Sequence, residues 1–254
     1  MLVLGAAVWF GTLGSLKSNS MKIQKDSKHK DQLNLIKQRL LSYAVLHPEI
    51  YSDATVEPGP GYFPCPDEDG DGIGNSETDT DADGVLDSGC GSPGTNNQLF
   101  VYGMVPYKIP ERNYTLVESD IDNRVFWYAV DARFVNNSQV YTSYDSNRFA
   151  ELNNNLVNTV TQADGSTSAP IMLDGEDDVV MVLFYAGEPL AGQSRPSVNV
   201  SDYLEQPAIV DGYVTDFNSV GSNPDTFNDY VISISRGEWE AAVLSRVSRD
   251  ADEN

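Results

Sequence analysis

The alternation of apolar and polar residues divides the chain into a helical N-terminal part and a C-terminal part built of short strands. Residues 1–16, MLVLGAAVWFGTLGSL, carry no charge, and residues 17–47 are polar but contain neither Gly nor Pro. Apolar residues within this polar stretch recur at spacings of three, four or their sums, namely Ile23, Leu33, Ile36, Leu40 and Ala44. Such spacing places them on one face of a helix. The pattern predicts a single helix from the apolar start to about residue 46.

The apolar segment at residues 1–16 falls just short of the roughly 18 residues expected of a membrane-spanning helix. It is therefore interpreted as a truncated membrane segment or as the core of a signal peptide, with a buried soluble helix as the third alternative. A signal peptide would need a basic start and a cleavage site of small residues, and the sequence displays neither.

The C-terminal part contains four apolar stretches of strand character, at residues 99–102, 125–130, 179–185 and 230–234. Connections rich in Asn and Asp separate them. Gly237 is expected to end the last strand, and residues 238–249 have a helical composition. A long N-terminal helix followed by an antiparallel sheet and a short C-terminal helix is an α+β fold.

An acidic repeat lies in the irregular region at residues 49–98, which contains the proline-rich run VEPGPGYFPCP from Val56 to Pro66. The pattern Asp-x-Asp-x-Asp-Gly-x-x-Asp/Asn occurs twice there. Its candidate metal ligands are Asp67, Asp69, Asp71, Asn75, Asp79, Asp81, Asp83 and Asp87. Alternate carboxylates converge when the backbone coils, and the glycine permits the sharp turn. These hard oxygen ligands predict structural calcium as the cofactor.

The repeat matches an EF-hand calcium loop only in part, so two other interpretations remain. The twelfth position, which would carry a bidentate Glu, is Thr78 in the first copy and Cys90 in the second. The repeat looks more like the calcium loops of thrombospondin type 3 repeats. The other alternative is a solvated acidic loop that binds no metal.

Cys65 and Cys90 are the only cysteines, and they bracket the acidic repeat. A pair that closes a long loop is typical of a disulfide, whereas two isolated cysteines of a cytosolic protein would be buried thiols. We expect the disulfide, and with it a compartment outside the cytoplasm, where calcium is also plentiful.

The formal charge of −22 argues against a nucleic-acid partner, because most of the surface would repel a phosphate backbone. The sequence also offers little catalytic chemistry. His29 and His47 are the only histidines, and both lie on the expected helix. No nucleophile elbow, phosphate loop or zinc-binding spacing is present. The chain is therefore expected not to be an enzyme and to have no small-molecule substrate.

Aromatic residues cluster at Phe126, Trp127 and Tyr128, with Tyr141 and Tyr144 further on. They could form a sugar-binding platform or the core of a strand. The strand pattern favours the core.

Several stretches together resemble type IV pilin-like proteins, the bacterial minor pilins and pseudopilins. The Pro-Cys-Pro-Asp block after an amphipathic helix is the most telling of them. In chain order they are LLSYAVLHPE from Leu40, FPCPDEDGDG from Phe63, GMVPY from Gly103, FWYAVDARF from Phe126, VLFYAG from Val182, QSRP from Gln193 and FNDYVISISRGEW from Phe227.

The resemblance implies a non-enzymatic subunit of a type IV pilus or a type II secretion-like filament. Residues 1–16 would be the membrane and filament-core segment, 17–48 the half of the helix that covers the sheet, 49–98 the calcium region and 99–254 the sheet domain. The assembly interface would contain Leu2, Val8, Phe10 and Leu13. Other pilin subunits and the inner membrane would be the partners. The protein would have a periplasmic domain on an inner-membrane anchor, or be extracellular within a filament.

One feature of the family is missing from the sequence. Its leader ends in Gly before Met or an aromatic residue, with Glu five residues on, and neither Gly5 nor Gly11 is followed by such a Glu. Either the true start lies upstream or processing differs. The lysines after residue 16 favour a cytoplasmic domain by the positive-inside tendency, but we give more weight to the disulfide and calcium predictions. The rival function is a membrane-anchored, calcium-dependent adhesin.

Overall fold

The computed structural model of the chain describes residues 26–46, 60–67, 70, 72, 74, 90, 100–109, 114–118, 123–135, 160–161, 167–168, 171–197, 199–206, 216–220 and 226–252. These residues form an α+β fold that contains an antiparallel sheet, as the sequence predicts. The first helix of this part of the chain spans residues 26–46 and is called helix 26–46 below. No helix of the described residues has both the length and the apolar character needed to cross a membrane.

The strands of the main sheet are β1 (Phe100–Met104), β4 (Phe126–Asp131), β8 (Val179–Tyr185) and β10 (Tyr230–Ser235). Six short strands form two-stranded pairs: β2 (Lys108–Ile109) with β3 (Tyr114–Thr115), β5 (Val160–Thr161) with β6 (Thr167–Ser168), and β7 (Met172–Leu173) with β9 (Asp216–Phe217). The remaining elements are the 3-10 turns η3 (Asn123–Val125), η4 (Ala132–Phe134) and η5 (Val200–Asp202), and helix α3 (Arg236–Asp252).

The main sheet has the order β1-β4-β8-β10, and every neighbouring pair is antiparallel. The four apolar stretches of the sequence correspond to these four strands, and β8 has the predicted bounds. Beyond its predicted end, β1 extends to Met104. Trp127 pairs with Met104 on one side and with Phe184 on the other, which fixes the register at the centre of the sheet.

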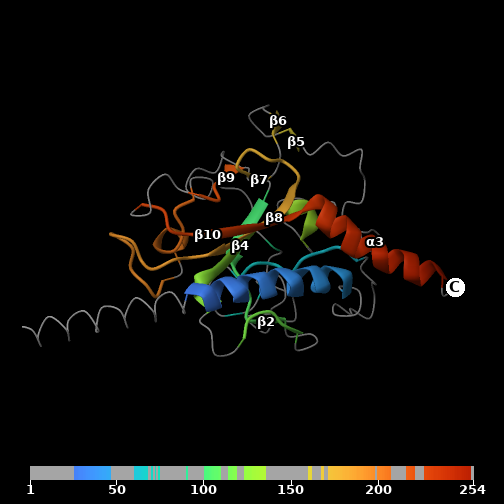
Figure 1. The fold of residues 1–254 in the computed structure, drawn as a ribbon, viewed down its shortest axis with the longest axis horizontal. Helices are drawn as coiled ribbons and strands as arrows, with labels where there is room; N and C mark the ends of the chain where they lie inside the picture. The colour runs from blue at the N-terminus through green and yellow to red at the C-terminus, as the bar shows by residue number, and fades with distance from the viewer. Residues whose placement is uncertain are drawn as a thin grey trace, which may run out of the picture.

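Helix 26–46 covers one face of this sheet (Figure 1). The predicted stripe is confirmed at Leu33, Ile36, Leu40 and Ala44, all of which are fully buried; Ile23 lies outside the described residues. These side chains belong to one core with alternate residues of β4, which are Phe126, Tyr128 and Val130. Burial of each Leu or Ile contributes about 1.5–3 kcal/mol, so the stripe fixes the helix on the sheet.

The second face of the sheet is covered by connecting segments. Trp127 and Ala129, the intervening residues of β4, pack with Tyr203, Leu204 and Phe217. Because both faces are buried, β4 and β8 are apolar along nearly their whole length.

The last strand passes directly into α3, which differs from the predicted boundary. Glu238 N donates to Ser235 Oγ (3.1 Å), and Ser235 N donates to Glu238 Oε2 (3.0 Å). This reciprocal pair is a capping box, so the helix begins at Arg236 and Gly237 lies in its first turn. The expectation that Gly237 ends the strand is therefore wrong; Ser235 ends it, because its hydroxyl caps the helix.

Helix α3 also contacts helix 26–46. Lys37 Nζ is 2.7 Å from Glu238 Oε1, and Arg246 Nη1 donates to the carbonyl of Val45 at 2.5 Å. Both contacts join residues 201 positions apart, so the two helices run in the same direction here. The C-terminal helix thus holds the end of helix 26–46.

Candidate functional site

The predicted disulfide between Cys65 and Cys90 is confirmed, with a Cα–Cα distance of 5.4 Å, and both residues are fully buried. Residues 60–67, which include the Pro-Cys-Pro block, pack between the end of helix 26–46 and the sheet. Gly61 N donates to Ala44 O (2.7 Å), and Tyr128 Oη donates to Pro64 O (2.7 Å). The first half-cystine is therefore rigidly held at the core.

Asp67, the first predicted metal ligand, is fully buried just after this block. Its Oδ1 accepts a hydrogen bond from Gly70 N (2.7 Å), and its Oδ2 accepts one from Gly72 N (2.8 Å). Both glycines have positive φ, of 82° and 89°, which a residue with a side chain adopts only with strain. The backbone N–H groups of Gly70 and Gly72 therefore both point at the Asp67 carboxylate.

The backbone around Asp67 is attached to the sheet at the end of β1. Asp67 and Met104 exchange two main-chain hydrogen bonds, of 2.9 and 2.8 Å. A Cβ on Gly103 would lie 2.6 Å from the carbonyl oxygen of Asp67, so only glycine permits this approach. Tyr107 N also donates to Gly72 O (2.7 Å). The GMVPY stretch thus supports the acidic loop, a role that no pattern in the sequence indicated.

The other seven predicted ligands lie outside the described residues: Asp69, Asp71, Asn75, Asp79, Asp81, Asp83 and Asp87. Within the residues that the structure describes, no group of three or more His, Cys, Asp or Glu side chains could hold a metal ion. The Asp67 carboxylate supplies two hard oxygen atoms, which is the ligand type that calcium prefers. Calcium at this loop stays a prediction.

We expect the Cys90→Ser variant to lose about 3 kcal/mol of unfolding free energy, because the bridge closes a loop with a sequence separation of 25. Urea denaturation with and without reductant measures the loss. Reductant should weaken the wild type and leave the variant unchanged. Equal denaturation midpoints for the wild type under both conditions would contradict the bridge.

A second polar site lies at the end of β4, where Asp131 and Arg133 form a buried ion pair. Their side chains are 2% and 4% exposed, and Arg133 Nη2 lies 2.6 Å from Asp131 Oδ2. Arg133 Nε donates to the same carboxylate, and Asp131 Oδ1 also accepts from the Arg133 backbone N–H (2.9 Å). The carboxylate therefore both neutralises the guanidinium and caps η4.

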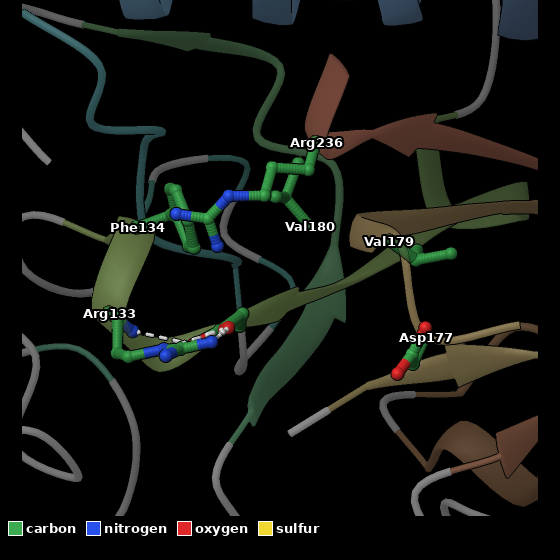
Figure 2. A pocket seen from close by; sticks show the side chains of 7 residues that line it. Arg133, Phe134, Asp177, Val179, Val180 and Arg236 are labelled. Carbon is green, nitrogen blue, oxygen red and sulfur yellow. Dashed lines mark hydrogen bonds and ion pairs between the residues drawn. The ribbon is translucent and has the colours of Figure 1, made fainter. Parts of the chain in front are cut away.

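The cavity beside this pair is small. Its volume is about 10 Å³, enough for one water molecule. Figure 2 shows Arg236 reaching toward Phe134, Arg133 beyond that ring and Asp177 across the cavity. Arg236 is itself paired with Glu240 at 3.1 Å. Because each arginine has a carboxylate partner and the space is water-sized, this site belongs to the folded core and offers no room for a ligand.

A third site lies where helix 26–46 begins. His29 Nδ1 and Tyr185 Oη are 2.8 Å apart, and Tyr185 Oη lies 3.4 Å from Asp26 Oδ1. Burial and the carboxylates of Asp26 and Glu188 raise the pKa of Tyr185 well above its ordinary value. His29 therefore faces the sheet and fastens the helix to β8.

A cavity of about 260 Å³ lies next to this contact, lined by His29, Arg124, Glu188 and the 195–196 segment among others. Arg195 holds its outer wall by donating to the carbonyls of Gly187, Asp202 and Tyr203. Most of the Arg195 donors are thus used within the protein, and Tyr203 lies between Arg195 and Trp127.

The aromatic cluster of β4 belongs to the core, as the strand pattern favours. Phe126, Trp127 and Tyr128 are 0%, 3% and 0% exposed, so they present no platform for a sugar. Tyr141, Tyr144 and His47 lie outside the described residues, as do the predicted assembly residues Leu2, Val8, Phe10 and Leu13.

Comparisons of the chain with protein-family models, with curated proteins and with solved structures give no match. Membership of the pilin-like group is therefore a proposal, based on the residues and geometry of this chain.

Proposed function

We propose that the chain is a non-enzymatic, pilin-like subunit, a minor pilin or pseudopilin, of a type IV pilus or type II secretion-like filament. Its apolar start would anchor it in the inner membrane and later enter the filament core. Its folded domain would be periplasmic, or extracellular once the filament is assembled. Its partners would be other pilin or pseudopilin subunits.

The observation that carries the proposal is the packing of helix 26–46. The described part of its apolar stripe is fully buried against an antiparallel sheet, and α3 contacts the helix through Glu238 and Arg246. The uncharged segment at residues 1–16 precedes this helix in the sequence. A helix fixed in this way by its C-terminal half would present an apolar N-terminal segment from a rigid base, which a filament subunit requires.

We also propose a structural calcium ion in the acidic loop. The segment from Asp67 to Asp87 contains nine acidic residues and no Lys or Arg. Without a cation, their negative charges would repel one another. The Asp67 carboxylate supports the proposal, because it lies buried at the first ligand position. The disulfide and the main-chain hydrogen bonds between Asp67 and Met104 already hold the loop at Cys65, Asp67 and Cys90. Calcium would then order the residues between them.

In cells, we expect Val8→Asp to abolish filament assembly while the domain still folds, because a charge in the filament core is costly. In-cell cross-linking measures assembly, and resistance to proteolysis measures folding. Val220→Asp is the matched control: Val220 is 79% exposed, in the sheet domain. It should retain the wild-type cross-linked ladder.

Wild-type protein that is anchored but cross-links only as a monomer would overturn the filament proposal and favour the membrane-anchored adhesin. Loss of the folded domain in the Val8→Asp variant would contradict the proposal that the apolar start serves assembly while helix 26–46 serves folding.

A further inference from the structure

Two acidic side chains meet between residues 199–206 and the start of β10. Asp229 is 7% exposed, and its Oδ1 is buried without a hydrogen-bond partner. The backbone N–H of Glu205 donates to the Asp229 carboxyl, so the two acidic residues are direct neighbours. These residues are far from the acidic loop in the sequence, and neither was singled out by any sequence pattern.

Each of the other carboxyl oxygens has a neutral donor. Asp229 Oδ2 accepts from Glu205 N (3.1 Å) and lies 3.5 Å from Gln206 Nε2. Glu205 Oε1 accepts from Gln193 Nε2 (2.6 Å), and Glu205 Oε2 accepts from Asn228 N (3.2 Å). Four neutral contacts thus hold the two carboxyl groups in place.

No lysine, arginine or histidine of the described residues donates to either carboxyl group. Arg195 is connected only indirectly, since its Nη2 donates to Gln193 Oε1, and the amide of Gln193 then donates to Glu205. The side chains of Glu188 and Asp202, on neighbouring segments, are acidic as well. Two ionised carboxylates on neighbouring residues, one of them buried, would therefore repel each other without compensation.

A single positive charge between the two groups removes this repulsion. Calcium requires about six to eight oxygen ligands. Here three of the four carboxyl oxygens already accept N–H groups, and only Asp229 Oδ1 lacks a partner. A proton needs only one oxygen to carry it, and the buried Asp229 Oδ1 supplies that oxygen. The geometry therefore favours a proton over a metal ion.

We propose that the buried Asp229 carboxyl keeps a proton at neutral pH beside Glu205, and that this acid pair is a pH-sensitive fastening between residues 199–206 and residues 226–229. Burial, followed by the charge of Glu205, raises the pKa of Asp229 to about 8. Loss of the proton above that pH leaves two like charges beside each other and loosens the junction.

The junction supports the wall of the 260 Å³ cavity. Residues 199–206 contain Tyr203, whose ring lies 5.4 Å from that of Trp127, and whose carbonyl accepts from Arg195. Loosening of Glu205 should therefore change the surroundings of Trp127, whose indole N–H donates to Arg124 O (2.8 Å). The Trp127 indole N–H signal in NMR spectra reports this change.

The test compares the wild type with Asp229→Asn between pH 5 and 8.5. The folded wild type holds a proton that the unfolded chain, with an ordinary Asp pKa of 3.8, has lost. For one such proton the folding equilibrium constant falls about tenfold for each pH unit in this range and levels off above pH 8. Asp229→Asn removes the titrating group, whereas all other groups titrate in both proteins. The folding equilibrium constant of the variant should therefore fall less steeply with pH than that of the wild type, by about tenfold less for each pH unit.

The ¹³C signal of the Asp229 carboxyl, followed by NMR in the full chain, should show a midpoint far above 4, and the Trp127 indole signal should shift with the same midpoint. Glu205→Gln is the second variant and serves alone if Asp229→Asn does not fold; it should lower the Asp229 midpoint. An Asp229 carboxyl that is ionised at pH 6, or parallel pH dependences of wild type and variant, would overturn the proposal. A midpoint that falls when calcium is added would also overturn it, since a metal ion would then occupy the pair.

Discussion

Replacing Asp131 with Ala is expected to lower the free energy of unfolding by about 3–5 kcal/mol, because the variant leaves a buried guanidinium without its carboxylate. Arg133 is 4% exposed in its side chain, and the bonds of Nε and Nη2 to Asp131 would be lost. The variant would also lose the cap on the backbone N–H of Arg133, at the first turn of η4.

The matched control replaces both members of the pair, with Asp131→Leu and Arg133→Met in one protein. A buried ion pair replaced by apolar residues of similar size is often neutral in stability, since its desolvation offsets its attraction. We expect the double variant to unfold at a higher urea concentration than Asp131→Ala. Equal loss in both proteins would mean that capping of η4, and not the charge, is the main contribution of Asp131.

The sequence predicted those elements that have a strong periodic pattern. The stripe at Leu33, Ile36 and Leu40 identified the sheet-facing side of helix 26–46, because its spacing repeats with the helical turn. The four main strands were found because their apolar residues are continuous; both faces of β4 and β8 are buried. The disulfide was predicted because only two cysteines occur and they close one loop.

Polar contacts between distant segments could not be predicted in this way. With 38 acidic residues, no pairing such as Asp229 with Glu205 stands out from the sequence. The capping box at Ser235 and Glu238 could have been predicted from the sequence, because Ser-x-x-Glu is a known signal for the start of a helix. The role of Gly103 depends on the close approach of Asp67, a tertiary contact that has no local signal.

The second large effect is expected at Asp67, where the Asp67→Ala variant should lose about 3 kcal/mol of unfolding free energy. Its carboxylate accepts two backbone N–H bonds while fully buried, and a hydrogen bond to a charged group contributes roughly 1.5–3 kcal/mol. Removing it leaves the N–H groups of Gly70 and Gly72 without this acceptor. Urea denaturation gives the loss directly.

Melting temperatures measured with calcium and with a chelator separate the structural role of Asp67 from metal binding. The bonds from Gly70 and Gly72 to Asp67 require no cation, so Asp67→Ala should weaken the protein even when a chelator is present. Asp71→Ala and Asp83→Ala, at later ligand positions, should lower the melting temperature only in calcium, and the chelator should bring the wild type down to their level. If the chelator leaves the melting temperature of the wild type unchanged, the acidic repeat binds no structural calcium. Asp67 would then serve only to coil the start of the loop, and the disulfide would be the main constraint on the rest of the loop.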